Sequence, residues 1–541
     1  MKLNSSILAT LAFTAAAPLA SAQIERAQPQ ELIQQPFLTV NAGVAMDIEG
    51  DRAAVTSGGG TFIFSDPFVS FYERAPDGSW DVVVNLSAPT AGRYFGGAVS
   101  LSGDRGLVGD PGRPGQAGRV YGTRFSAGTW SVVGGFMTAP ASAADDLFGL
   151  SVDLDGDLAL VGAPGANGNT GAAHVYERDA STGLWDHIAQ LVPSASAAGD
   201  RIGGHVQWSG GRAYVGAVGS DIAALDGGAV FVFEETAPGT WTQVQWFSSA
   251  TGGGEQFGSR FEVDGSRLAV TAPGIPADAS SLSGTAYVYE RSLPSGPWAQ
   301  VDAVRVPTAS DVGFGVVMNA VALEGPNLVV AHSATIGAVH VFERRTNGTW
   351  RPSVRLETEF LAAGGPGTFG SYRFGAALAL DGGRLLVGAS EEEPDGILGA
   401  SGAAHEYVLG TLYQGRSRVF LPGPDSQPHH LRATDARAGD FYYMVGTASG
   451  TSPGTLDAPS GITVPINVDA YTLFLINSGG VGLSNPIGLL DANGEAESAY
   501  LMPGGLPPSY AGLELHYCYL IIDSTTFLFD QVSNPVRVRL Q

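Results

Sequence analysis

Short apolar runs separated by glycine-rich polar turns fill about the first three quarters of the chain. Within residues 149–192, apolar and β-branched runs lie at 149–155, 158–161, 172–178 and 185–192, and Gly, Pro, Asn and Asp bound them. Runs of this length and composition between turn residues predict four antiparallel β-strands. The pattern therefore indicates an all-β fold built from small four-stranded units.

The same unit recurs seven times. The recurring pattern is a Phe-Gly pair, a strand, a glycine turn, a second strand with a small-residue loop, an aromatic strand and a tryptophan. The anchors are the turn glycines Gly50, Gly103, Gly156, Gly210, Gly265, Gly325 and Gly382, and the tryptophans Trp80, Trp130, Trp185, Trp241, Trp298 and Trp350. Four strands per repeat of about 50 residues are typical of a propeller blade. The sequence thus predicts a seven-bladed β-propeller, and the alternative, a solenoid, usually has shorter repeats.

The seventh copy lacks its last strand. No tryptophan strand follows Ala403–Tyr407, and an open ring would leave strand edges exposed. Residues Glu31–Val40, "ELIQQPFLTV", lie before the first unit, where a fourth strand precedes every later unit. We predict that Glu31–Val40 completes blade seven and closes a propeller of residues 23–411.

Three segments resemble FG-GAP repeats: "FGGAVSLSGDRGLVGDP", "FGLSVDLDGDLALVGAP" and "FGAALALDGGRLLVGAS". The resemblance extends over about residues 41–409. It implies the propeller fold of bacterial FG-GAP proteins and of the integrin α-chain head. It implies little about function, because such repeats serve in adhesion, in ligand binding and as appendages of secreted enzymes.

The repeat pattern stops before residues 412–541. Strand-like runs at 441–445, 471–476, 513–523 and 536–540 alternate there with turns rich in Gly, Ser and Pro. Many short strands with regular turns favour a β-sandwich, and about 130 residues is an ordinary domain size. We expect a spacer or surface-attachment module, with an export signal as the alternative.

The N-terminus and the charge balance predict an exported protein. Lys2 precedes an apolar run that ends in Ala20-Ser21-Ala22, the pattern of a signal peptide cleaved after residues 1–22. That run is too short to span a bilayer comfortably. The formal net charge of −24 disfavours nucleic acid and anionic membranes as partners. We expect a secreted or cell-surface protein without a transmembrane segment in its mature chain.

One segment, "DLDGD", carries Asp153, Asp155 and Asp157 and is the first candidate for a metal site. FG-GAP calcium loops resemble D-x-[DN]-x-[DN]-G-x-x-D. Here Gly156 falls one residue early, and Leu160 stands where a last carboxylate would be sought. The shortened loop predicts a two-residue hairpin whose turn needs a positive φ. We therefore expect a polar turn and no cofactor, with these three aspartates as a weak calcium candidate.

The other repeats carry varied residues at the same two positions. Equivalent to Asp153 are Asp47, Ser100, Gln207, Glu262, Ala322 and Ala379, and equivalent to Asp155 are Glu49, Ser102, Ser209, Asp264, Glu324 and Asp381. Such variation favours turn residues over a shared cation site.

Other candidate chemistry has simpler interpretations. His174, His340 and His405 occupy one repeat position that Phe and Tyr fill elsewhere, so a shared metal centre is not expected. Gly450–Gly454 matches the letters of a nucleophile elbow but lies in a turn of an all-β region. Cys518, the single cysteine, lies in an apolar run typical of a buried structural residue. No catalytic residue set is therefore predicted.

These patterns predict an exported, non-catalytic propeller that binds an extracellular protein or glycan through loops on one face. One alternative is a secreted polysaccharide hydrolase or lyase that uses two propeller carboxylates. Another is a structural component of the cell surface. Convergence of two carboxylates in a pocket would favour the enzyme.

Overall fold

The computed structural model of the chain describes residues 25–27, 31–34 and most of residues 44–540. The residues within 44–540 that it does not describe are 58–66, 76–78, 90–93, 113, 250–252, 274–283, 293–295, 306–316, 334–336, 346, 357–373, 391–402, 410–411, 415–417, 420–424, 434–436, 452–453, 458, 461, 479–481, 493, 503–508, 510–512, 524–527 and 534–535. The predicted signal peptide, residues 1–22, lies outside the described residues. So do residues 35–40 of the segment Glu31–Val40, which is predicted to close the ring.

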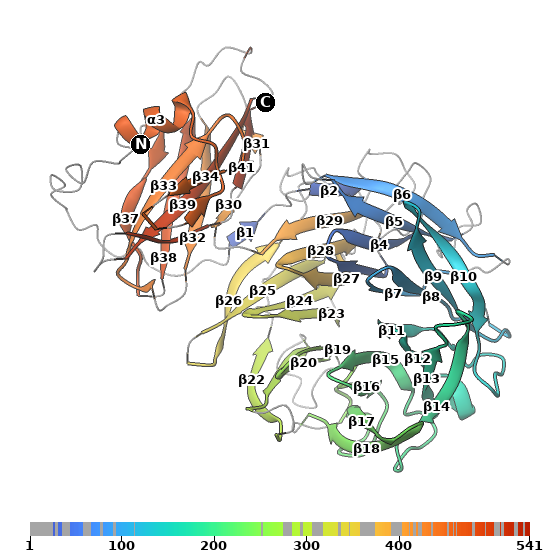
Figure 1. The fold of residues 1–541 in the computed structure, drawn as a ribbon. Helices are drawn as coiled ribbons and strands as arrows, with labels where there is room; N and C mark the ends of the chain where they lie inside the picture. The colour runs from blue at the N-terminus through green and yellow to red at the C-terminus, as the bar shows by residue number, and fades with distance from the viewer. Residues whose placement is uncertain are drawn as a thin grey trace, which may run out of the picture.

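Seven sheets of the described chain stand around a common axis, with β7, β11, β15, β19, β23 and β27 visibly innermost (Figure 1). The first three sheets consist of β3 (Met46–Glu49), β4 (Arg52–Ser57), β5 (Phe68–Arg74) and β6 (Trp80–Ser87); of β7 (Ala98–Ser102), β8 (Arg105–Asp110), β9 (Arg119–Ser126) and β10 (Thr129–Met137); and of β11 (Ser151–Asp155), β12 (Leu158–Ala163), β13 (Ala172–Arg178) and β14 (Trp185–Leu191). The short helix α1 (Ala166–Asn169) lies in the loop before β13.

The next four sheets follow the same order. They consist of β15 (Ile202–Ser209), β16 (Arg212–Ala217), β17 (Ala229–Ala237) and β18 (Thr240–Phe247); of β19 (Arg260–Asp264), β20 (Arg267–Ala272), β21 (Thr285–Glu290) and β22 (Ala299–Arg305); of β23 (Val317–Glu324), β24 (Asn327–Ser333), β25 (Ala338–Arg344) and β26 (Trp350–Leu356); and of β27 (Phe374–Asp381), β28 (Arg384–Ala389) and β29 (Ala403–Val408). The chain is therefore an all-β propeller.

Two N-terminal strands join the last two sheets. β2 (Glu31–Gln34) pairs antiparallel with β29 and is the fourth strand of the seventh sheet, where the repeat pattern lacked one. β1 (Glu25–Ala27) pairs parallel with β26 and adds a fifth strand to the sixth sheet. The two ends of the propeller sequence therefore build the same part of the ring.

The core lies between neighbouring sheets. One cluster combines Leu107 and Val120 of the second sheet with Val152 and Val161 of the third. Both faces of β12 are buried because each sheet packs between two others. This packing explains why the second strands are continuous apolar runs in the sequence and do not alternate between apolar and polar residues.

Glycines allow the close approach of adjacent sheets. A Cβ on Gly162 would clash with the carbonyl oxygen of Gly203, which follows Ile202 at the repeat position that Phe-Gly pairs occupy elsewhere. The same clash would occur between Gly109 and Gly149 and between Gly216 and Gly258. The glycine near the end of β8, β12 and β16 is thus required by backbone contact with the following sheet.

The C-terminal region contains two further sheets around one core. The first consists of β30 (Leu412–Gln414), β32 (Asp425–Arg432), β38 (Glu495–Met502) and β36 (Leu483–Ser484). The second consists of β31 (Arg418–Val419), β41 (Val536–Leu540), β39 (Glu514–Ile522), β33 (Phe441–Thr447) and β37 (Ile487–Leu489), with β40 (Phe529–Val532) on β39. A small hairpin joins β34 (Thr455–Asp457) and β35 (Ile462–Val464). Leu431 and Tyr500 of the first sheet and Met444 and Tyr517 of the second belong to one apolar cluster.

One predicted strand of this region is wrong. Residues 471–476 form the helix α3 (Ala470–Asn477). Asp469 caps it by accepting from Thr472 N, and the Thr472 hydroxyl accepts from Asp469 N in return. A short apolar run does not by itself distinguish a strand from a buried helix.

The C-terminal region lies beside the sixth sheet, with β1 between them (Figure 1). Arg351 of β26 forms an ion pair of 3.1 Å with Glu495 of β38. The boundary between the two regions stays a prediction. Within the described residues, no helix combines the length and apolar character needed to cross a membrane.

Candidate functional site at the axis of the ring

The innermost strands carry three rows of equivalent side chains. The middle row is Asp47, Ser100, Asp153, Gln207, Glu262, Ala322 and Ala379. The lower row, next to the turn glycines, is Glu49, Ser102, Asp155, Ser209, Asp264, Glu324 and Asp381. The upper row, two residues before the middle row, is Ala45, Ala98, Ser151, His205, Arg260, Ala320 and Ala377.

Middle-row side chains bond to the backbone of the next sheet. The acceptor and donor pairs are Asp47 Oδ2 and Leu101 N (2.7 Å), Ser100 Oγ and Leu154 N (3.2 Å), Asp153 Oδ2 and Trp208 N (2.6 Å), and Gln207 Oε1 and Val263 N (2.9 Å). The innermost strand has an unpaired edge, so each bond satisfies a backbone donor that the sheet leaves open. These polar residues therefore hold neighbouring sheets together near the axis.

Lower-row side chains accept hydrogen bonds from the turn glycines of the next sheet. Their acceptor and donor pairs are Glu49 Oε2 and Gly103 N (2.5 Å), Ser102 Oγ and Gly156 N (3.1 Å), Asp264 Oδ2 and Gly325 N (2.8 Å), Glu324 Oε1 and Gly382 N (2.8 Å), and Asp381 Oδ2 and Gly50 N (2.7 Å). The last pair joins the seventh sheet to the first. Acidic residues are frequent here because a carboxylate accepts well from a backbone N–H.

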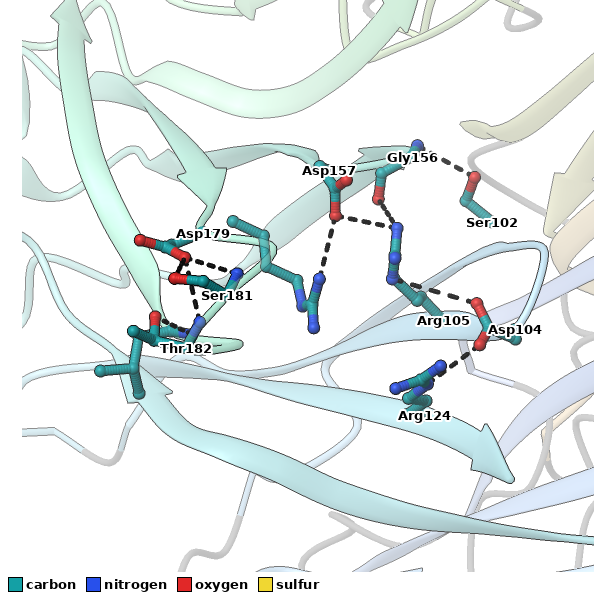
Figure 2. A network of polar contacts seen from close by, with 11 residues as sticks. Ser102, Asp104, Arg105, Arg124, Gly156, Asp157, Asp179, Ser181 and Thr182 are labelled. Carbon is teal, nitrogen blue, oxygen red and sulfur yellow. Dashed lines mark hydrogen bonds and ion pairs between the residues drawn. The ribbon is translucent and has the colours of Figure 1, made fainter. Parts of the chain in front are cut away.

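Arginines bond to the carbonyl oxygens of the same turn glycines. Arg52, Arg105, Arg267 and Arg384 each donate to the carbonyl oxygen of the turn glycine in the next sheet. Figure 2 shows this link between the second and third sheets, where Ser102 and Arg105 contact Gly156 N and O. These contacts explain the recurring arginine two residues after the turn glycine.

The three calcium candidates of the third repeat make separate contacts. Asp153 accepts from the Ser100 hydroxyl and from the next sheet, whereas Asp157 pairs with Arg105 at 2.8 Å and with Arg178 at 3.3 Å (Figure 2). Asp155 is exposed at the end of β11. Among the residues that the structure describes, no group of three or more His, Cys, Asp and Glu could hold a metal ion. Asp153 itself lies in β11 and bonds to the next sheet, while Gly156 and Asp157 form the hairpin turn.

Three middle-row carboxylates, Asp47, Asp153 and Glu262, lie at equivalent positions of alternate sheets. Burial raises the pKa of Asp47 to about 7, of Asp153 to about 6 and of Glu262 to about 8. The charge of Asp153 adds to the raised pKa of both Asp47 and Glu262. Gln207 Nε2 donates to Glu262 Oε1 at 2.5 Å. All three side chains keep some accessible surface, as expected for groups that face the axis.

The upper row contains a cation. Arg260 is exposed and donates to Ser259 O at 2.7 Å, and surrounding protein atoms lower its pKa from the usual value. Burial, and then the Arg260 charge, lower the pKa of His205 to about 3. The neutral His205 ring lies with Nε2 2.9 Å from Phe261 O, so this nitrogen carries the proton and donates.

The shared role of these rows is not apparent from the sequence. The residue types vary among the equivalent positions, and such variation argues against a common role. In a ring of sheets, equivalent positions of the innermost strands meet at the axis. The repeat period and the alternation of side chains along a strand together identify which residues of each repeat form these rows.

Comparison with known families agrees with this architecture. Residues 135–176, from the end of β10 through β13, match the family model of the FG-GAP repeat. The chain carries an FG-GAP repeat. The matched FG-GAP segment includes Asp153 and the turn at Gly156. No curated protein matches the sequence.

Solved structures to which this chain is similar come from several organisms. A protein from Lactobacillus plantarum is 14% identical, with a TM-score of 0.44 over 76% of this chain and 95% of that chain. The periplasmic gluconolactonase PpgL of Pseudomonas aeruginosa is 17% identical, with a TM-score of 0.41 over 66% and 96%. Sqt1 of Saccharomyces cerevisiae is 8% identical, with a TM-score of 0.38 over 68% and 83%.

The remaining candidate residues lie apart in the propeller and in the C-terminal region. His174, His340 and His405 are buried in three different sheets. His174 Nδ1 lies 3.1 Å from His187 Nε2 in its own sheet. Cys518 is buried, and burial raises the pKa of its thiol to about 12. Ser452, the central residue of the elbow-like segment, lies outside the described residues.

Proposed function

We propose that the protein is an exported, non-catalytic binding protein that recognises an extracellular protein or glycan through one face of the propeller. We define the loop face as the connections between second and third strands and the connections between sheets. Both kinds of connection leave the same end of the ring, opposite the turn glycines. Loops carried on a rigid scaffold are where binding residues concentrate.

The observation that supports this proposal is the mutual bonding of these loops. Gly115 N donates to Asp145 Oδ1 at 2.7 Å, and Gly199 N donates to Asn169 O at 3.0 Å. Gly254 N donates to Leu225 O at 2.9 Å. Each bond joins a loop of one sheet to the connection that leads to the next sheet. A surface ordered before binding loses less conformational entropy when a ligand arrives.

The loop face also exposes apolar side chains. Leu225 is 73% exposed, and Tyr94, Leu150 and Val192 are exposed as well. Apolar and aromatic anchors on an otherwise polar surface are typical of interfaces with proteins and glycans.

The coupled axial carboxylates favour one alternative, a secreted polysaccharide hydrolase or lyase. Carboxyls with pKa values near neutrality are among the groups that glycoside cleavage uses. We rank binding first because Asp47 and Asp153 already accept bonds from the backbone of the next sheet. A third alternative is a structural component of the cell surface.

The test is a protein and glycan array probed with residues 23–541, followed by a product assay on each ligand found. Leu225→Asp should weaken binding more than about tenfold, because it would replace an apolar side chain that the ligand covers by a charge. Leu184→Asp is the matched control, since Leu184 is 51% exposed at the opposite end of the ring. Turnover of a bound glycan that is lost in Glu262→Gln would replace the binding proposal by the enzyme.

A further inference from the structure

The loop between β12 and β13 carries an exposed Asn-Gly pair, Asn167-Gly168, within the short helix α1. It is one of three Asn-Gly pairs in the sequence, with Asn347-Gly348 and Asn493-Gly494, and Asn493 lies outside the described residues. Among the residues that the structure describes, neither the amide nitrogen of Gly168 nor the side chain of Asn167 forms a hydrogen bond. The two groups can therefore approach each other without giving up a bond to the rest of the protein.

The main chain at this pair is open and is not held in a regular helix. Asn167 and Gly168 have φ values of 52° and 69°, in the left-handed region that asparagine tolerates but does not favour. Nothing lies within 4 Å of a Cβ placed on Gly168, so the space beside its main chain is empty of neighbouring groups. A loop with so few local contacts opens more readily than the strands on either side of it.

We propose that Asn167 is a site of spontaneous deamidation, with water as the only co-reactant. The nitrogen of Gly168 attacks Cγ of Asn167, the Cγ–Nδ2 bond breaks, and Nδ2 leaves as ammonia with the proton that Gly168 gives up. Water then opens the five-membered ring that has formed. Opening at Cγ gives aspartate, and opening at the main-chain carbonyl carbon gives isoaspartate, in which the chain runs through the side chain. This modification does not depend on the binding function proposed above.

The pair Asn347-Gly348 has the same sequence in different surroundings. It lies in the turn between β25 and β26, and Asn347 is exposed there. Gly348 N donates to Arg345 O at 2.9 Å, while Asn347 Oδ1 accepts from Thr349 N at 3.0 Å and from Thr349 Oγ1 at 2.8 Å. Both reacting groups must give up hydrogen bonds before the ring can close, so this pair should react more slowly than Asn167-Gly168.

The chain just after Asn167 carries a link to the fourth sheet. Asn169 O accepts from Gly199 N at 3.0 Å and from Arg201 N at 3.1 Å, and both donors lie in the connection that leads to β15. Isoaspartate at position 167 lengthens the main chain by one bond close to this acceptor. We therefore expect isoaspartate formation to displace Asn169 O and to weaken these two hydrogen bonds.

The experiment is to incubate residues 23–541 at mildly alkaline pH and to follow each Asn-Gly peptide by mass spectrometry. Isoaspartate is measured with protein L-isoaspartate methyltransferase and labelled S-adenosylmethionine. In the folded chain, the Asn167 peptide should convert at least about tenfold faster than the Asn347 peptide. Its rate should rise with pH, because the attacking nitrogen must lose a proton. In concentrated urea the two peptides should convert at similar rates, because the hydrogen bonds around Asn347 are then lost.

Two variants and a second measurement serve as controls. Asn167→Gly tolerates the positive φ and lacks the side-chain amide, so it should lose most of the methylation. Asn347→Ser is the matched control and should be methylated like the wild type. Hydrogen exchange at the amides of Gly199 and Arg201 should become faster as the wild type ages, and should not change with age in Asn167→Gly.

Three results would overturn this proposal in whole or in part. Deamidation at Asn167 is wrong if its peptide stays unmodified in the folded chain. The role assigned to the hydrogen bonds is wrong if the Asn347 peptide converts as fast as the Asn167 peptide there. The consequence for the fourth sheet is wrong if exchange at Gly199 and Arg201 is the same before and after conversion.

Discussion

At the scale of single residues, Glu262 shows how position decides protonation. Its carboxyl accepts from Gln207, lies near Asp153 and Asp47, and has a pKa raised by burial to about 8. A raised pKa means that the folded protein binds this proton more tightly than the unfolded chain. The stabilisation is present at low pH and is lost as the pH rises from about 4.5 to about 8.

Glu262→Gln should therefore change the pH dependence of stability. The amide keeps the hydrogen-bonding shape without the charge, so the variant should be more stable than the wild type at pH 8–9, by roughly 2–4 kcal/mol. At pH 4 the two proteins should differ little. The measurement is urea unfolding across pH 4–9, with exposed Asp81→Asn as a control whose curve follows the wild type. If the free energy of unfolding depends on pH in the same way for Glu262→Gln and for the wild type, the raised pKa of Glu262 is contradicted.

Asp469 is shifted in the opposite direction. Burial opposes its ionisation, but donors from Thr472, Ala448 and Thr447 outweigh burial and lower its pKa to about 2. A lowered pKa gives stability that is present above about pH 4 and is lost as the pH falls toward 2.

Asp469→Ala should remove this stabilisation at neutral pH. Loss of the helix cap should cost about 1–2 kcal/mol at pH 7 and much less near pH 2. Chemical unfolding of the full chain, followed by the near-ultraviolet signal of the tyrosines around α3, measures this. Asp469→Asn, which retains an oxygen acceptor, is the control and should lose less. A cost that is equal at both pH values would show that the carboxylate charge has no role.

At the scale of elements, two kinds of glycine differ in why they are needed. Gly156 has a φ of 59°, and nothing lies within 4 Å of a Cβ placed on it. Glycine is therefore favoured at position 156 because of its positive φ and not because of lack of space. Gly162 lies in β12, where a Cβ would meet Gly203 O and Ser151 Oγ, so its requirement is steric.

Substitutions should separate these two causes. Gly156→Asn should be nearly neutral because asparagine tolerates a positive φ, while Gly156→Ala should cost about 1 kcal/mol. Gly162→Ala should cost more, roughly 2–4 kcal/mol, because the backbone of the next sheet must shift. Thermal unfolding ranks the three variants. A Gly162→Ala protein as stable as Gly156→Ala would contradict the close contact.

The sequence identified most elements but not how their residues meet. Repeat periodicity and turn glycines predicted strands such as 158–161 and 172–178, and the structure has β12 and β13 there. The apolar run at 471–476 is a helix because Asp469 and Thr472 cap its start, a local signal that outweighs the strand-like composition of the run. The axial rows were not anticipated because contacts such as Asp153 with Trp208 depend on closure of the ring.

At the scale of the whole molecule, closure of the ring depends on its first strands. β2 supplies the outer strand of the seventh sheet, while Gly50, Asp381 and Arg384 link that sheet to the first near the axis. Outer and inner contacts thus secure the same junction.

Deleting residues 24–40 should lower the melting temperature sharply, by roughly 5 °C or more, because the strand edge of β29 would lose its partner. Differential scanning calorimetry of the full mature chain measures this. Asp381→Asn weakens the inner contact at the same junction and should have a smaller effect. An unchanged melting temperature after the deletion would show that β2 does not stabilise the ring.

The pairing of Glu31 with Glu406 also sets an order of events during synthesis. The ribosome makes β2 first, but its partner strand appears only after nearly the whole propeller has been translated. Until then both edges stay open to other chains, which is a hazard for long β-rich proteins. Joining segments so distant in sequence is slow because the intervening chain loses much entropy at that moment. Ring closure should therefore be a late folding step, and the nascent chain should need protection from aggregation until it occurs.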